Sequence, residues 1–90
     1  MDIIRSTQFK RDFKKIKNSP QKIELFSRAL LLLLNRKPLP KTYDEHSLKG
    51  NKQGFVDIHL FPDFLLIYRI DLLKSEINLA RIGIHSELFK

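Results

Sequence analysis

The segment FVDIHLFPDFLLIY, at residues 55–68, constrains the fold of this 90-residue chain more than any other segment. Its residues alternate in the manner of a β-strand, break at Pro62 and then alternate again. Proline followed by aspartate is typical of a tight turn. The segment therefore predicts an antiparallel hairpin, with strands at about 54–60 and 64–70 joined by the turn FPDF.

Two helices are predicted ahead of this hairpin. The first has apolar residues at helical spacing with lysines between them, and Ser6 or Thr7 can cap it. The second is predicted from about Pro20 to Arg36, where two nearby prolines stop it. Its run of five leucines is apolar on every side, so the helix must be covered on more than one face.

The remaining strands complete an α+β fold. Strands are predicted at residues 2–5 and at about 76–84, which gives the order β-α-α-β-β-β. A helical hairpin ahead of an antiparallel meander indicates helices packed on one face of a mainly antiparallel sheet. We expect a single domain spanning residues 1–90.

The composition indicates the cellular compartment in which the protein works. The chain has no cysteine, which excludes disulfides and thiolate metal sites and suits a reducing cytoplasm. Its longest apolar run, residues 29–34, is far below the roughly 20 residues that cross a bilayer. We therefore expect a soluble cytoplasmic protein with no membrane partner.

The net charge of +7 is unevenly distributed. Residues 1–41 hold eleven Lys and Arg against three Asp and Glu, whereas residues 42–90 hold six against seven. Lys10, Lys14 and Lys17 share one face of the first predicted helix. Such a stripe indicates a polyanionic partner, either nucleic acid or an acidic protein, unless the lysines only solvate the helix.

The chain's three histidines fall near one predicted surface. The apolar row of strand 54–60 is expected to pack on the helices, so the row with His59 faces outward. The same alternation on the last strand places Arg81 on this open face and continues to His85. Asp63 lies at the turn beside them, and His46 belongs to the long polar loop.

This set of side chains allows two chemical interpretations. Metal-free RNA cleavage needs a base for a 2′-hydroxyl, an acid for the leaving 5′-oxygen and cations for the phosphate. Three histidines could equally bind zinc. A single surface histidine usually has no special role, so the convergence of the set is what indicates a site.

Three motifs resemble the YafQ-type toxins of the RelE/ParE superfamily, the toxic halves of bacterial type II toxin–antitoxin pairs. They are YDEHSLKG, VDIHLFPDFLLIY and RIGIHSELF. The resemblance is close from Tyr43 to Phe89, and the first half matches in layout. It implies a RelE-like fold and a ribosome-dependent mRNA endonuclease that needs no metal or other cofactor.

The resemblance also implies a catalytic set. The family has functional residues at the positions of His46, His59, Asp63, His85 and Phe89. His85 is the implied general acid. The implied base is His59 assisted by Asp63, or else His46. Because histidine ordinarily titrates near pH 6.5, acid and base forms coexist near neutrality.

The resemblance also implies five substrate contacts, of which Phe89 is already named above. Phe64, where the family typically has tryptophan, and Phe89 would stack on or enclose the bases. The family commonly has arginine where this chain has Val56, which alternation assigns to the core. The phosphate charge would then fall to the remaining cations, which are Arg81, Lys49 and Lys52.

The partners implied are a ribosome with its mRNA and a cognate acidic antitoxin. Lys10, Lys14 and Lys17 are the expected ribosome contacts. Two alternatives share the fold: a ParE-like inhibitor of DNA gyrase, and a catalytically inactive nucleic-acid-binding module. The histidines argue against the first, and Val56 favours the second.

Overall fold

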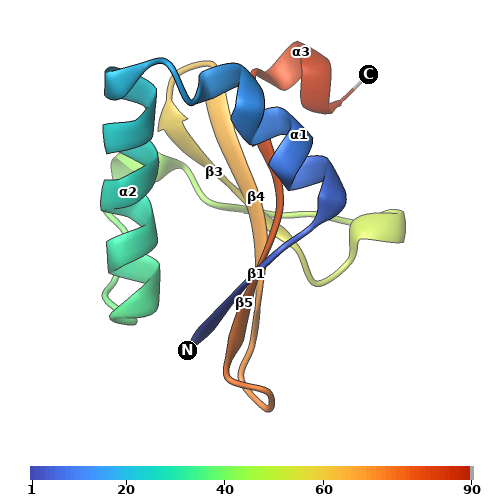
Figure 1. Ribbon diagram of the computed structural model, residues 1–90. Coiled ribbons are helices and arrows are strands. Elements are labelled where there is room, and N and C mark those ends of the chain that lie inside the picture. Colours follow the sequence, from blue (N-terminus) through green and yellow to red (C-terminus); the bar gives the residue numbers. More distant parts are fainter. Residues whose placement is uncertain (90) are drawn as a thin grey trace.

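The structure, a computed structural model, describes residues 1–89 (Figure 1). Its helices and strands are β1 (Asp2–Arg5), α1 (Thr7–Ile16), α2 (Pro20–Leu34), β2 (His46–Ser47), β3 (Val56–Phe61), β4 (Phe64–Asp71), β5 (Glu76–Gly83) and α3 (His85–Leu88). Two single 3₁₀ turns, η1 (Lys41–Tyr43) and η2 (Gly50–Lys52), lie in the long loop. The predicted order β-α-α-β-β-β is confirmed, with β2 and α3 as additions.

The five strands form one sheet in the order β1-β5-β4-β3-β2. Only the pairing of β1 with β5 is parallel, and the other three are antiparallel. The expected α+β class with a mainly antiparallel sheet is therefore confirmed. Both long helices lie on one side of this sheet (Figure 1).

Local signals in the sequence determine where the helices begin and end. The Ser6 hydroxyl caps α1 by accepting a hydrogen bond from the Phe9 amide at 2.9 Å. Pro20 occupies the first turn of α2, as expected. The helix α2 ends at Leu34 rather than Arg36, because Arg36 adopts a left-handed φ of 52°. No helix within residues 1–89 is both long and apolar enough to cross a membrane.

The main core lies between the helices and the sheet. Phe9, Phe26 and Leu33 face inward from the helices and are at least nine-tenths buried. Val56 packs against this cluster, which confirms the assignment of its side chain to the core. The leucine run of α2 is not fully covered, since Leu31 is 59% exposed.

The opposite face of the sheet is partly covered as well. A second cluster joins Leu65 and Ile67 of β4 to Leu88 of α3. Leu88 is 4% exposed, so an apolar side chain anchors the helical turn of the tail HSELF. This anchoring positions His85 and Phe89 over the face that lacks the long helices.

The alternation expected for β5 is broken by an irregularity in its pairing. Ile77 and Leu79 are buried on the helix side, not on the open face where unbroken alternation with Arg81 would place them. Between Leu79 and Arg81 the pairing with β4 shifts by one residue. An extra residue of this kind reverses the side on which later residues lie, so Arg81 shares the face of its partner Ile67.

A buried carboxylate attaches α1 to β5. Pairing of β1 with β5 ends at Leu79, and beyond it Asp12 accepts a hydrogen bond from the Ile82 amide at 3.1 Å. The same carboxylate accepts from Nε of Arg81 at 2.7 Å and from its Nη2 at 3.2 Å. Asp12 is 5% exposed, and its hydrogen bonding raises the pKa of Arg81.

Replacing Asp12 with alanine should lower the free energy of unfolding by about 1–3 kcal/mol, because the buried Ile82 amide loses its acceptor and the partly exposed Arg81 loses its partner. Chemical denaturation measures this loss. The control is Glu24→Ala, which removes the exposed Glu24–Arg28 pair and should cost below about 1 kcal/mol. Equal losses in the two variants would show that the buried pair contributes no more than a surface one.

Candidate active site

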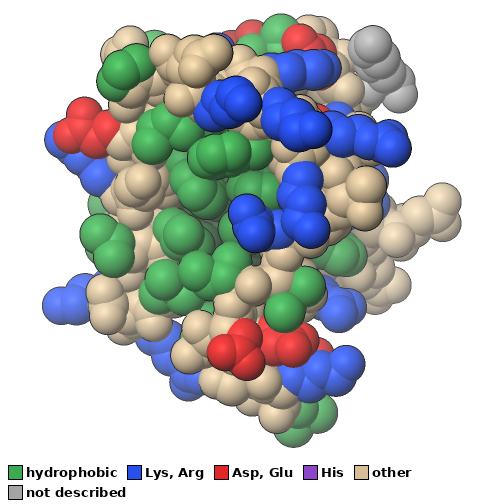
Figure 2. Space-filling model, in the orientation of Figure 1, with side chains coloured by type: hydrophobic (Ala, Val, Ile, Leu, Met, Phe, Trp, Pro, Cys, Tyr) green, Lys and Arg blue, Asp and Glu red, His purple; other side chains and the backbone are tan. Residues whose placement is uncertain are grey.

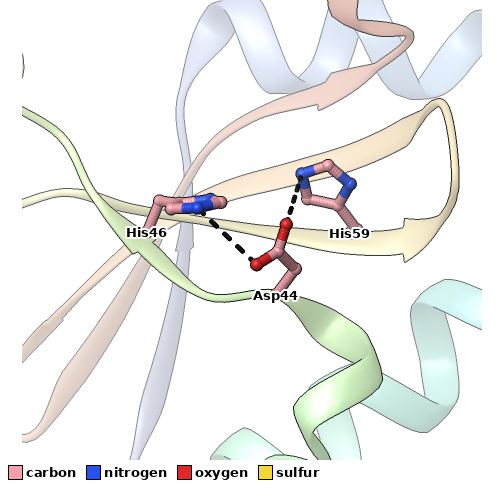
Figure 3. Close-up of side chains that lie close together, drawn as sticks. All are labelled: Asp44, His46 and His59. Carbon is pink, nitrogen blue, oxygen red and sulfur yellow. Dashed lines mark ion pairs between the residues drawn. The ribbon is translucent and has the colours of Figure 1, made fainter.

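A carboxylate and two imidazoles meet beside the β2–β3 edge of the sheet (Figure 3). Asp44 follows η1 in a left-handed conformation with φ of 47°, a region that aspartate tolerates. One of its oxygens lies 3.6 Å from Nε2 of His46, and the other lies 4.0 Å from Nε2 of His59. The two rings are 6.1 Å apart between centroids.

Asp57 flanks His46 on the side of its other ring nitrogen. Its backbone pairs with that of His46 across β2 and β3, and its Oδ1 lies 3.5 Å from Nδ1 of that ring. Asp57 is 92% buried, and Oδ1 has no hydrogen-bond partner among residues 1–89. His46 is thus placed between two carboxylates, one exposed and one buried.

A second group forms around the start of α3. The Asp63 carboxylate accepts a hydrogen bond from the His85 amide at 3.3 Å. The His85 ring lies 4.8 Å from that of Phe89, and the Lys52 amino group lies 5.5 Å above the Phe89 ring. An imidazole and an aromatic ring at α3 are therefore held beside a cation from η2.

The two groups lie on the same face of the sheet. His59 pairs with Leu65, which pairs in turn with Gly83, two residues before His85. Two strand spacings separate His59 from Gly83, or about 10 Å between their backbones. Leu65 belongs to the cluster on the face opposite the long helices, so both histidine groups belong to that side.

An open cleft adjoins the first group. It has a volume of about 590 Å³, and Tyr43, Asp44, His59 and Phe61 are among its lining residues. Phe61 is 55% exposed, which leaves an aromatic surface at the edge of the cleft. A planar base can stack on such a surface.

Two of the expected substrate contacts are engaged within the protein itself. Phe64 is 4% exposed and faces the helix-side core, so its ring has no accessible surface for a base. The turn after Pro62 sets this orientation, with Phe64 and Leu66 on one side of β4 and Leu65 on the other. Arg81 is engaged by Asp12. Lys49 and Lys52 are both exposed.

Sequence reasoning missed the two carboxylates that accompany the histidines. The expected partner of His59 was Asp63, whereas the structure brings Asp44 to His59 and Asp63 to the amide of His85. The only available signal was spacing, since Asp44 precedes His46 by two residues and Asp57 precedes His59 by two.

Basic side chains gather over α1 (Figure 2). Lys10, Lys14 and Lys17 are all exposed, with Lys17 at the C-terminal end of the helix. Lys15 reaches across to Glu87 of α3 at 3.6 Å. The predicted stripe is therefore present on a helix that contacts the turn bearing His85.

A basic helical hairpin on one face of this sheet, with a histidine and carboxylate site on the other, defines the class of small RelE-like toxins. The family profile described as "Bacterial toxin of type II toxin-antitoxin system, YafQ" matches residues 1–90, and the chain belongs to this family. The resemblance inferred from three short motifs is thereby confirmed.

Individual relatives agree in sequence and in structure. The mRNA interferase toxin YafQ of Escherichia coli K12 is 34% identical over 89 residues, covering 98% of this chain and 95% of that protein. A metal-bound toxin from Helicobacter pylori gives a TM-score of 0.88 at 35% identity, with 99% of each chain covered. A chain of the E. coli DinJ–YafQ toxin–antitoxin complex gives 0.86 at 32% identity, covering 99% of this chain and 98% of that one.

Proposed function

We propose that this protein is an mRNA endonuclease that acts on the ribosome as the toxin of a type II toxin–antitoxin pair. The observation that supports this function is the placement of His85 and of the His46–His59 pair on one face of the sheet. About 10 Å separates the backbones of His59 and Gly83, which lies two residues before His85. Acid and base groups on opposite sides of a phosphate are what in-line cleavage of RNA requires.

The proposed reaction is attack of a 2′-hydroxyl on its own 3′-phosphate. His59 or His46 takes the hydroxyl proton as the O2′–P bond forms. His85 gives a proton to the 5′-oxygen as the P–O5′ bond breaks. The products are a 2′,3′-cyclic phosphate and a 5′-hydroxyl, and no metal ion takes part in the proposed steps.

Substrate contacts follow from the same geometry. Lys52 lies against the Phe89 ring beside His85, which favours it over Arg81 as the cation for the phosphate. Lys49 is on the same loop. Phe89 offers a stacking surface next to the general acid.

The proposed partners are a ribosome and an antitoxin. The stripe Lys10, Lys14 and Lys17 would contact ribosomal RNA, which presents phosphates at high density. The E. coli relative forms a complex with DinJ. By analogy, an acidic antitoxin segment that folds on binding would neutralise the basic half of this chain.

Primer extension on a defined mRNA tests the function. With purified ribosomes, the protein should give cuts within codons at the ribosomal A site, and without ribosomes the yield should fall steeply. Intact mRNA in both arms would refute endonuclease activity. Inhibition of gyrase supercoiling together with intact mRNA would establish the ParE-like alternative.

Metal must be controlled in this assay, because the H. pylori relative was solved with metal bound. A chelator selective for transition metals over magnesium leaves the ribosome intact. Cleavage should survive this treatment if the proposed acid–base mechanism is correct. Loss of cleavage that added zinc restores would establish a metal-dependent reaction instead.

A further inference from the structure

We propose that Phe55 and Arg69 form the centre of a second nucleotide subsite, which holds a base of single-stranded RNA on the open face of the sheet. The guanidinium carbon of Arg69 lies 5.3 Å from the centroid of the Phe55 ring. Val56 pairs with Tyr68 across β3 and β4, so the preceding residue, Phe55, stands opposite Arg69. The inference rests on the proposed endonuclease function and extends it to a contact outside the histidine groups.

This pair shares an apolar floor with the Phe89 ring. Phe55 and Phe89 both pack against the second hydrophobic cluster, which joins β4 to α3. Each ring carries a cation, Lys52 over Phe89 and Arg69 over Phe55. Aromatic rings combined with cations are the usual surface for single-stranded nucleic acid, because bases stack on the flat groups while the cations follow the phosphates. The second pair therefore repeats, farther along the same face, the chemistry of the first.

The cations of this surface are available to an anion. Lys49, Lys52 and Arg69 are exposed, and none of them forms an ion pair with a carboxylate of residues 1–89. Arg81, in contrast, is held by Asp12. A planar guanidinium stacks on an RNA base and donates hydrogen bonds to a phosphate from its edge, so Arg69 can do both.

An open hollow of about 460 Å³ adjoins the pair, along the loop that joins β2 to β3. Lys49, Gln53 and Phe55 are among its lining residues. Gly50 and Gly54 also line it, with φ of 71° and 92°. These two positions without side chains let a sugar–phosphate backbone approach closely. The Gln53 amide and the Lys49 ammonium can then bond to a base edge or a phosphate.

The order of side chains along β3 places the subsite relative to the reacting phosphate. Phe55 precedes His59 by four residues, or about 13 Å of strand. His46 lies between them through its pairing with Asp57. His85 follows the end of β5, at the His59 end of this row. Because the proposed base stands next to the 2′-hydroxyl and the proposed acid next to the departing 5′-oxygen, the subsite falls on the 5′ side of the cleaved bond.

NMR titration of the isotope-labelled protein with a hexanucleotide of 2′-O-methyl RNA, which cannot be cleaved, tests the subsite. We expect the amide signals of Gly54, Phe55 and Arg69 to shift with a saturable dependence on RNA. Arg69→Gln should weaken this binding at least about fivefold, because the loss of one base stack costs about 5–150-fold. It should also lower the slope of log affinity against log salt by about 0.7, the value for one phosphate contact on a single strand.

Matched variants separate recognition from charge and from packing. Lys74→Gln removes the same charge at an exposed position in the turn after β4 and should bind the RNA like the parent. Phe55→Tyr keeps the ring under Arg69 and should bind normally, whereas Phe55→Leu keeps an apolar anchor without the ring and should bind more weakly. The subsite would be overturned if the parent bound no RNA saturably, if Arg69→Gln bound like the parent, or if Arg69→Gln and Lys74→Gln lost equal affinity.

Cleavage of ribosome-bound mRNA is the arm that depends on the proposed function. Abasic nucleotides are placed in turn upstream of the cut. One of them should slow cleavage by the parent but slow it less in Arg69→Gln, because that variant has already lost the base contact. Equal slowing of both proteins at every upstream position would overturn the 5′ placement. RNA binding that depends on Arg69, together with intact mRNA, would disprove the endonuclease and keep the subsite.

Discussion

Replacing His85 with alanine should lower the rate of mRNA cleavage about 10²–10⁴-fold, the usual contribution of a positioned general acid. The backbone amide of His85, not its ring, binds Asp63, so this hydrogen bond survives the substitution. The helix α3 is anchored by Leu88, which is also unchanged. Single-turnover cleavage of ribosome-bound mRNA measures the loss.

The control for this substitution is Ser86→Ala on the same exposed turn, which should retain parental cleavage. Both variants should unfold at the parental denaturant concentration and pellet with ribosomes like the parent. Cleavage at the parental rate by a folded His85→Ala protein would remove His85 from the mechanism. Loss of ribosome binding together with cleavage would assign His85 to docking instead.

Much of the fold could be predicted because its signals are local. Ser6 caps α1 as expected, and Pro20 opens α2. The turn at Pro62 separates β3 from β4, and every predicted strand boundary lies within two residues of the observed one. Hydrophobic periodicity and helix capping depend on residues that are neighbours in the sequence, so both can be read from the sequence alone.

The details that could not be predicted depend on pairing between distant segments. The shift between Leu79 and Arg81 is determined by register with β4, and it places Ile77 in the core and Arg81 opposite Ile67. No alternation rule applied to β5 alone reveals such a shift. The attachment of Arg81 to Asp12, 69 residues away, follows from the same geometry.

The sequence analysis named the three histidines and Asp63 of the candidate site but not Asp44 or Asp57. His59 falls on the face that strand alternation predicts, and the motifs that resemble the family contain all three histidines. Asp44 reaches His59 only because η1 ends in a left-handed residue, and this turn leaves no periodic signal. Phe64 was misassigned because resemblance indicated an accessible ring where the structure buries one.

Two contacts connect the basic helix α1 to the strand and the turn that lead to His85. The helix α1 is attached to β5 by Asp12 and to α3 by the Lys15–Glu87 ion pair. The exposed Lys15 pair is expected to contribute below about 1 kcal/mol, so the buried Asp12 hydrogen bonds dominate. A ribosome that binds the lysines of α1 would therefore orient the turn bearing His85 through a rigid connection.

Reversing Lys10, Lys14 and Lys17 to glutamate should weaken ribosome binding about 10²-fold or more, because each lysine–phosphate pairing contributes close to tenfold at 0.1 M salt. The three side chains are exposed, so stability should change little. The slope of log affinity against log salt should fall by about one for each lysine–phosphate pairing that the substitutions remove. Co-sedimentation with ribosomes across a salt series measures both quantities.

The matched control separates specific docking from general charge. The double variant Lys10→Glu, Lys14→Glu is compared with Lys37→Glu, Lys74→Glu, which makes the same change in net charge at exposed positions outside α1. If the stripe is the docking surface, only the variant Lys10→Glu, Lys14→Glu should lose ribosome affinity steeply. High salt should narrow the difference in affinity between the two double variants, because screening removes the phosphate attraction. Equal losses of affinity in the two double variants would mean that the ribosome responds to total charge. If the triple variant sediments with ribosomes like the parent, the three lysines only solvate the helix.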